Sequence, residues 1–280
     1  MSNENIDRAD AIFRNASATG ELQSSFESLG NELRLRSLAL RGSNLEHDPE
    51  LDRSDLARYF ASVSNRLSDV FARLLYLHWT EQKLIPEDSD QSQSTWAMFS
   101  SLGIKDFHAD VASTMDSIAP VIIGSTIGLR GKDIRDLPRF ALISDHSNSR
   151  NRKELPTDIT VIIDSANQWW PAVKTIRDSV IHREHDRIIF GKLGDPLEFQ
   201  IYDKSKKPLM IDPRLLVSRA HNVVDFKTYS AYVIGNLWIL LDDIASVIGA
   251  HLGISVDRAT PSFRWGSWEH ISEGLVDIAG

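Results

Sequence analysis

The feature that most constrains the fold is the apolar run from Ala231 to Leu252, which carries the acidic pair Asp242 and Asp243 in its middle. Large apolar side chains recur at three- and four-residue steps over residues 226–251, which predicts one long α-helix. A run of this length would suit a membrane span, but two adjacent carboxylates near the bilayer centre would be costly. We therefore expect a helix buried in the core of a soluble protein, with no membrane partner.

The same helical period recurs elsewhere, and Pro171 interrupts one of the stretches, where we expect a kink or a restart. The sequence predicts a mainly α fold, a helical bundle of about six to eight helices. Besides 226–251, helices are expected over residues 56–78 and 157–180, with shorter ones around 6–17, 21–40 and 106–119.

One segment breaks this pattern with short runs rich in Ile and Phe, separated by Gly194-Asp195-Pro196 and a lysine-rich turn at 204–207. Such runs between turn signals predict a small β-hairpin or three-stranded flap, inserted before the C-terminal long helix. The expected strands are Arg187–Gly191, Leu197–Tyr202 and Pro208–Ile211.

The chain contains no cysteine, which excludes a thiol nucleophile, a thiolate zinc site and a redox pair. Its net charge of -8 argues against a protein that coats nucleic acid by charge alone. The charge is uneven, however, because residues 130–220 hold 17 basic and 13 acidic side chains, against 11 and 19 in residues 1–129. Any binding of nucleic acid is therefore expected to be local to the basic block.

We expect one compact domain with three parts: an acidic helical part (1–129), a region with the flap and long helix (130–256) and a docked tail (257–280). Trp265 and Trp268 favour docking of the tail, since exposed indoles are costly. The N-terminus has no basic and apolar leader pattern, so we expect a cytoplasmic location.

The basic block contains Arg177, Asp178 and His182 at the end of a long apolar helix. An arginine followed by a histidine after four to six residues is common by chance, and the chain holds six such pairs. Only Arg177 is followed by a carboxylate or amide side chain. The other pairs are Arg41/His47, Arg73/His78, Arg139/His146, Arg214/His221 and Arg264/His270.

Arg177, Asp178 and His182 resemble the motif of the HEPN superfamily, in which an Arg and a polar residue precede a His near the end of a helix. The resemblance implies a mostly helical domain, in many members a metal-independent ribonuclease of toxin–antitoxin or phage-defence systems. It also implies a homodimer through the motif helix, with both motifs in one cleft, and an antitoxin or defence partner. Glu184 stands where some members carry a regulatory tyrosine, so that regulation is not expected.

Cleavage of RNA by its own 2′-hydroxyl needs a base with a near-neutral pKa and a permanent cation for the phosphorane charge. We expect His182 to be the acid–base group, Arg177 to clamp the phosphate and Asp178 to orient either one. The RNA path is expected to include Lys174, Arg183 and His185, with no metal or cofactor required. Five residues turn an ideal helix by roughly 500°, which leaves these two side chains about 140° apart. Either the helix loosens or a second chain completes the site.

Other interpretations of these residues stay open. Arg177 and His182 can simply pair with helix carbonyls and nearby acids, in a HEPN-like module that binds RNA or a protein without catalysis. His182, His185 and Asp186 have metal-compatible spacing but lack further ligands. Lys204, Lys206 and Lys207 favour a solvated turn over a phosphate contact. Tryptophans on an apolar helix are more often core than base-stacking platforms, although Trp170 also suits the dimer contact.

Overall fold

The computed structural model describes residues 3–42, 53–83, 90–127, 138–145, 152–181, 189–190, 194–201, 211–218, 222–256, 261–263 and 268–279. The fold is mainly α-helical, with a small antiparallel sheet before the last long helix, as predicted. The described residues hold nine α-helices. They are α1 (Asn3–Thr19), α2 (Ser25–Gly42), α3 (Arg53–Lys83), α4 (Asp90–Thr126), α5 (Phe140–Ser144), α7 (Thr157–Ala166), α8 (Trp170–Ile181), α9 (Phe226–His251) and α10 (Trp268–Ala279).

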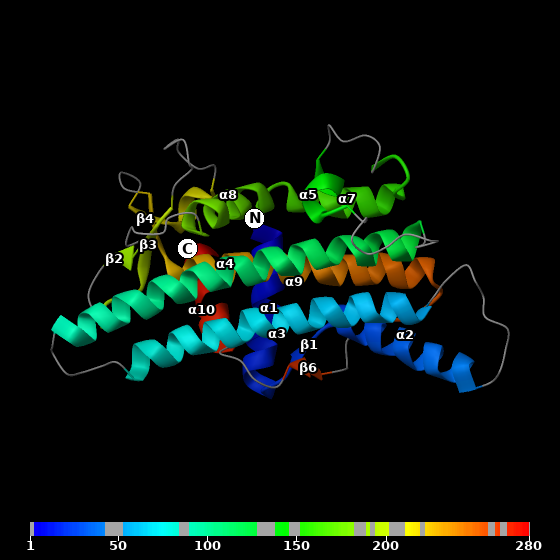
Figure 1. Cartoon of the computed structure of the whole chain (residues 1–280), viewed down its shortest axis with the longest axis horizontal. Coiled ribbons are helices and arrows are strands. Elements are labelled where there is room, and N and C mark those ends of the chain that lie inside the picture. The colour runs from blue at the N-terminus through cyan, green and yellow to red at the C-terminus, as the bar shows by residue number, and fades with distance from the viewer. Residues whose placement is uncertain are drawn as a thin grey trace.

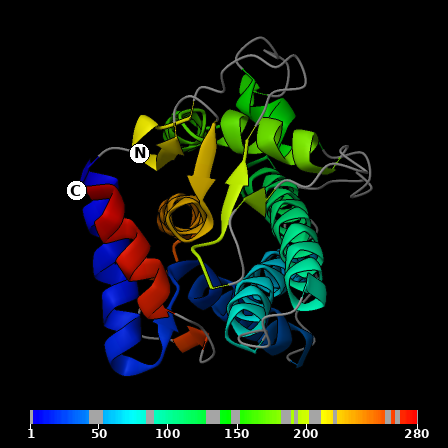
Figure 2. The same cartoon turned by 90° about the vertical axis from the view of Figure 1, so that its left-hand side faces the viewer.

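Helix α9 is the centre of the fold (Figure 2). In that view α1 and α10 lie on one side of it, and α3 and α4 lie on the other. Residues 229–242 of this helix are all buried, so its middle is enclosed around the whole circumference, as the all-round apolar sequence there requires. By length and composition α9 is the one described helix that could cross a membrane, and 78% of its most apolar window is buried inside this fold.

The acidic pair of α9 connects this helix to the N-terminal helices. Asp242 is buried and accepts a hydrogen bond from the backbone N–H of Ser25 at 3.3 Å, at the start of α2. Asp243 forms an ion pair with Arg8 of α1, with an N–O distance of 2.7 Å. The two adjacent carboxylates of α9 thus each make a polar contact with an N-terminal helix, Asp242 with the start of α2 and Asp243 with α1.

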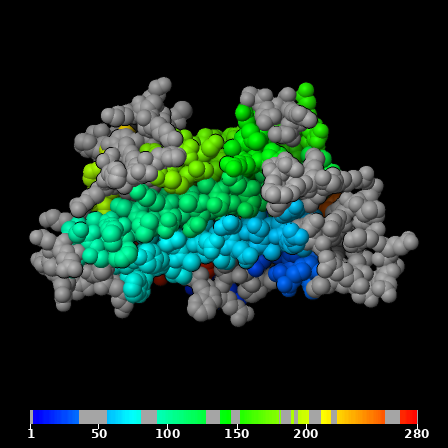
Figure 3. Space-filling model, in the orientation of Figure 1, coloured from blue at the N-terminus to red at the C-terminus, as the bar shows by residue number. Residues whose placement is uncertain are grey.

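Helices α3 and α4 form a long antiparallel pair across one face of the molecule (Figures 1 and 3). They approach closely at Gly103, where an added Cβ would lie 2.3 Å from Cδ2 of Leu77. The helix predicted over 106–119 is only the middle of α4, which begins at Asp90 and continues past Pro120. Serines and Gly103 weaken the apolar period before residue 106, and contact with α3 stabilises that part instead.

The stretch 157–180, predicted as one helix with a break, is two helices. Helix α7 ends at Ala166 and α8 begins at Trp170, with Pro171 as the second residue of α8. Proline is well tolerated there, because the N–H groups of a first helical turn have no intrahelical acceptor. Pro171 therefore restarts the helix, as expected, and α8 lies along the same face of the molecule as α4 (Figure 3).

The sheet has four antiparallel strands in the order β2-β3-β5-β4. The first two predicted strands contain β2 and β3. Of the third, Pro208–Ile211, residues 208–210 lie outside the described residues and Ile211 is not in a strand. Strands β4 and β5 were not predicted. β4 and β5 are only three residues each, too short for a period-2 pattern. The strands are β2 (Ile189–Phe190), β3 (Glu198–Gln200), β4 (Leu216–Ser218) and β5 (Val223–Asp225), with a 3-10 turn at Pro213–Leu215.

Helix α10 packs against both α1 and α9, so the two ends of the described chain meet on one side of the core (Figure 2). Ser272 donates to Asp10 at 2.7 Å, and Trp268 is buried against the rings of Phe13 and Phe71. Beside them, β1 (Leu22–Gln23) pairs with β6 (Pro261–Phe263).

Candidate functional site

Arg177 lies on α8, with its guanidinium at the edge of the helix interface. The apolar face of α8 is buried through Val173 and Ile176, and the helix packs against α4. The Arg177 side chain keeps 28% of its surface exposed, and its Nη1 atom pairs with Oδ1 of Asp178 at 2.9 Å. Its Nε atom is buried and has no hydrogen-bond partner within the described part of the chain. Arg177 therefore forms an ion pair with the adjacent Asp178, and its Nε donor has no partner among the described residues.

Below Arg177, helix α4 presents His108, Ala112 and Asp116 at four-residue intervals, which places them on one face. Arg177 lowers the pKa of both His108 and Asp116, so its charge lies near each of them. Ala112, midway between the two, is a small side chain. The charge of Arg177 thus acts on two residues of α4 that lie about two turns apart, a histidine and an aspartate.

His108 is completely buried and is held by two hydrogen bonds. Its Nδ1 lies 2.7 Å from the carbonyl oxygen of Ile104, and its Nε2 lies 2.9 Å from the hydroxyl of Tyr229. Because a carbonyl only accepts, Nδ1 carries the proton and Nε2 accepts from Tyr229. Burial lowers the pKa of His108 to about 4, against a smaller raising effect of the Ile104 bond. At neutral pH this imidazole is neutral, and both ring nitrogens are occupied.

The surroundings of His108 are aromatic. Its ring lies 5.9 Å from that of Phe199 on β3 and 5.4 Å from that of Tyr229 on α9, and Phe226 contacts the same group. Burial also raises the pKa of Tyr229 well above its ordinary value, so its hydroxyl keeps the proton that it donates. His108 is thus a structural histidine that joins α4, the sheet and α9 beneath the site.

Asp116 is half-buried and has cations near it from two other elements. Burial raises the pKa of its carboxyl, while Arg139, Arg177 and Lys174 each lower it by a smaller amount. The carboxylate also accepts a hydrogen bond from the backbone N–H of Phe140, the first residue of α5. Asp116 therefore connects α4 to the start of α5, and the charges of Lys174 and Arg177 on α8 favour its ionised form.

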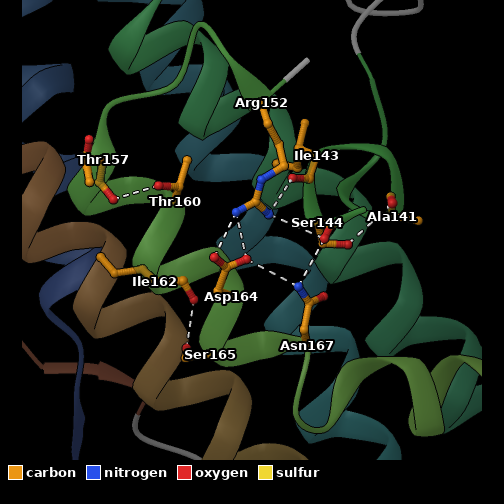
Figure 4. A network of polar contacts seen from close by, with 10 residues as sticks. All are labelled: Ala141, Ile143, Ser144, Arg152, Thr157, Thr160, Ile162, Asp164, Ser165 and Asn167. Carbon is orange, nitrogen blue, oxygen red and sulfur yellow. Dashed lines mark hydrogen bonds and ion pairs between the residues drawn. The ribbon is translucent and has the colours of Figure 1, made fainter. Parts of the chain in front are cut away.

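A polar network holds the other end of α5 (Figure 4). Nη2 of Arg152 lies 2.7 and 2.8 Å from the two carboxylate oxygens of Asp164. Nη1 of the same arginine donates to the carbonyl oxygens of Ile143 and Ser144, at the end of α5. Asn167 donates to the same Ser144 carbonyl at 3.0 Å. Both ends of α5 are thus tied to neighbouring helices, which fixes the segment that carries Arg139.

The described residues contain only part of the predicted site. Lys174 lies one turn before Arg177, on the same side of α8, and both side chains are partly exposed. His182, Arg183 and His185 lie outside the described residues, directly after the last residue of α8. The convergence of Arg177 and His182, and the homodimer that would bring two motifs together, therefore stay predictions.

Trp169 and Trp170 are both core residues, each with 3% of its surface exposed. Their rings lie 6.0 Å apart, edge to face, beneath the start of α8. Neither indole can stack on a base, and Trp170 is covered by its own chain, so it does not supply the dimer contact considered for it.

The Arg73/His78 pair, which has the same spacing as Arg177/His182, has structural partners. Arg73 lies 3.1 Å from Asp106 and 3.8 Å from Asp110, both on α4, and thereby joins the α3–α4 pair. The His78 ring lies 5.3 Å from that of His270 on α10. Arg73 thus pairs with carboxylates of the neighbouring helix, as a structural residue would, whereas the ion pair of Arg177 is with Asp178 on its own helix.

Across the described residues, no group of three or more His, Cys, Asp or Glu side chains is arranged to hold a metal ion. No family model, no curated protein and no solved structure matches the chain.

The sequence did not identify His108 and Asp116, whose pKa values Arg177 lowers, or Arg139, whose charge acts on Asp116. They lie on α4 and just before α5, far from α8 in sequence, and only tertiary packing brings these helices together. The one local signal was the spacing of His108 and Asp116 on a single face of the predicted helix 106–119, which does not reveal the partner helix.

Proposed function

We propose that this protein is a metal-independent endoribonuclease of the HEPN type, acting in a toxin–antitoxin or phage-defence context. The observation that carries the proposal is the placement of Arg177: it sits on a partly exposed edge of α8, paired with Asp178, beside Lys174. The mainly helical fold is consistent with the resemblance.

In the proposed reaction the 2′-hydroxyl of a nucleotide attacks its own 3′-phosphate. A bond forms between O2′ and phosphorus and the bond from phosphorus to the 5′-oxygen of the next nucleotide breaks. The products are a 2′,3′-cyclic phosphate and a 5′-hydroxyl, so no water, metal or redox partner enters the balance. His182 takes the proton from O2′ or gives one to the leaving oxygen, and Arg177 stabilises the phosphorane through a bidentate fork.

The test compares the wild type with Arg177→Ala and His182→Ala on end-labelled single-stranded RNA in EDTA. His78→Ala is the matched control, since its Arg-x4-His spacing is the same but its arginine has structural partners. We expect cleavage by the wild type and the control, loss of at least a hundredfold in the other two, and ends that carry a cyclic phosphate. A 2′-deoxy nucleotide at the cleaved position should block the reaction.

Intact RNA with the wild type in both EDTA and Mg²⁺ would overturn the proposal, as would full cleavage by both variants. Retained RNA binding without cleavage would instead identify a non-catalytic binding module. Sedimentation at micromolar concentration tests the proposed homodimer, and circular dichroism shows whether each variant is folded.

A further inference from the structure

The α3–α4 pair carries a continuous band of apolar side chains, which we call the apolar band. At its middle, Tyr76 of α3 contacts Phe99 of α4 edge to face, with ring centroids 6.5 Å apart. Trp79 lies one turn from Tyr76, and Leu102 lies one turn from Phe99, so each extends the contact along its own helix. Met98 lies one turn before Leu102 on the same side of α4.

Much of the apolar band is open to solvent. Trp79 keeps 56% of its surface exposed, Met98 keeps 60% and Leu102 keeps 50%, while the two rings between them are half-buried. Figure 3 shows both helices on the outside of the molecule. Single exposed apolar side chains are normal, but a contiguous group of them marks an interaction site. The other large apolar side chains that are more than half exposed lie on three separate elements, α2, α7 and β4: Leu35, Val161 and Val217.

The apolar band also lacks charge. The parts of the two helices that carry it are residues 74–80 and 92–104, and none of these 20 residues is Asp, Glu, Lys or Arg. At the 25% charged fraction of the whole chain, about five of them would be charged. Charges of both signs return at the border, where Arg73 pairs with Asp106 across the helices at 3.1 Å and Lys105 follows the uncharged stretch. An uncharged centre within a polar rim is typical of protein–protein interfaces.

This charge pattern indicates which kind of partner fits. Nucleic acid and an anionic membrane surface both require several cations around the contact, and the rim here has both signs. A mixed rim matches a copy of itself, because the cation of one protomer can meet an acid of the other across a twofold axis. Each chain has a net charge of -8, so two copies repel each other least where their surfaces carry no charge.

We propose that the apolar band is a twofold contact between two copies of this chain. Two α3–α4 pairs packed face to face form a four-helix bundle, to which each copy contributes two helices. The pair is already assembled in one copy, since its helices pack closely at Gly103 and Leu77, so little order is lost when the copies meet. The contact is separate from the homodimer proposed through α8. Where both contacts form, dimers join through the apolar band into larger assemblies.

The test follows association of the full chain by sedimentation equilibrium over the micromolar range, for the wild type, Leu102→Glu and Met98→Glu. Both side chains are at least half exposed in one copy, so a glutamate at either position is compatible with folding. Val161→Glu is the matched control, because it replaces a 64% exposed apolar side chain of another helix, α7. Circular dichroism and thermal melting show that each variant is folded.

We expect the wild type to associate through the apolar band and Leu102→Glu and Met98→Glu to raise the dissociation constant of that step at least tenfold. The physical reason is that each glutamate would lose its water without gaining a partner, and a twofold contact contains every substitution twice. Val161→Glu should associate like the wild type. If the contact through α8 also forms, Leu102→Glu stays a dimer while the wild type is larger; without that contact, the wild type is a dimer and Leu102→Glu a monomer.

A wild type that sediments as a monomer throughout the range would refute the twofold contact. So would association of Leu102→Glu and Met98→Glu as tight as that of Val161→Glu. Vesicles of phosphatidylcholine test the other occupant: a monomeric wild type that binds them, together with a Leu102→Glu variant that does not, would assign the apolar band to a bilayer and overturn the proposal. None of these results depends on whether the chain cleaves RNA.

Discussion

The hydroxyl of Tyr229 on α9 donates a hydrogen bond to Nε2 of His108 on α4, at 2.9 Å, while Nδ1 of the same ring donates to the carbonyl of Ile104. The bond joins the central helix to the helix that carries Asp116, and it is completely buried. The Tyr229 hydroxyl therefore contributes to the attachment of α4 to the central helix.

Replacing that hydroxyl, in Tyr229→Phe, leaves Nε2 of His108 as a buried acceptor without a donor. We expect the free energy of unfolding to fall by about 1–3 kcal/mol, the cost of an unsatisfied buried group. Urea unfolding followed by circular dichroism measures the change. Tyr76→Phe is the control, because Tyr76 is only half-buried, and its loss should stay below about 0.5 kcal/mol. Equal effects of the two substitutions would show that the buried bond contributes nothing.

The buried His108 also predicts how stability depends on pH. Its pKa in the folded state is about 4, below the ordinary 6.5, so the unfolded chain takes up a proton first as the pH falls. Stability is therefore lost progressively from about pH 6.5 down to about pH 4, by on the order of 3 kcal/mol, and no further below that. Burial raises the pKa of Asp116, so the folded state binds this proton at a higher pH than the unfolded state does. As the pH falls, the protonation of Asp116 therefore favours the folded state and offsets part of the loss caused by His108.

Because the two effects oppose each other, a comparison with His108→Gln isolates the histidine. The variant is expected to be less stable than the wild type at pH 7, and this deficit should shrink as the pH falls to 4.5. Unfolding free energies at three pH values between these limits provide the measurement. Parallel curves for the two proteins would mean that His108 titrates alike in the folded and unfolded states.

Arg152 is expected to be intolerant of its closest substitute. Lysine cannot reproduce the two-pronged contact with Asp164 while donating to the carbonyls of Ile143 and Ser144. Arg152→Lys should therefore reduce the unfolding free energy by about 1–3 kcal/mol and increase amide hydrogen exchange in α5. Arg66→Lys is the control, since Arg66 is half-exposed and lies 3.8 Å from Asp69. Unchanged exchange in α5 would show that the network does not hold this helix.

Two helical glycines should respond differently to alanine. A Cβ on Gly274 of α10 would lie 2.7 Å from Cβ of Ala231 and 3.0 Å from the carbonyl of Lys227, neither of which can move without shifting α9. We expect Gly274→Ala to cost about 1–3 kcal/mol, despite the better helix propensity of alanine. At Gly103 the Cβ meets only the side chain of Leu77, which can change rotamer. Thermal melts should therefore place Gly103→Ala above Gly274→Ala.

The helices that carry a strong apolar period were predictable from the sequence. Helix α9 begins and ends where the spacing from Phe226 to His251 indicates, and α3 follows the buried series from Leu56 to Phe71. The first half of α4 was missed because its stability comes from contact with α3. Of the four strands of the sheet, the sequence predicted β2 and β3 but not β4 and β5. Strands this short are stabilised by pairing with a neighbouring strand, and their own side chains give little signal.

The candidate site shows the same division. Arg177, Asp178 and Lys174 are neighbours on one helix, so the sequence alone placed them together. His108 and Asp116 on α4 feel the charge of Arg177, and Asp116 that of Arg139 before α5, through a packing of helices that no local pattern encodes. A sequence thus indicates which side chains have suitable chemistry, while packing decides which distant charges surround them.

The enclosure of α9 has a consequence for the synthesis of the chain. Asp242 bonds to Ser25 across 217 positions, and Ser272 bonds to Asp10 across 262, so the earliest and the latest helices cover the same central helix. While the ribosome is still making α10, the apolar side of α9 that α10 will cover faces water. Full enclosure of α9 must wait until α10 has left the ribosome, and until then the nascent chain exposes an apolar segment that chaperones can bind.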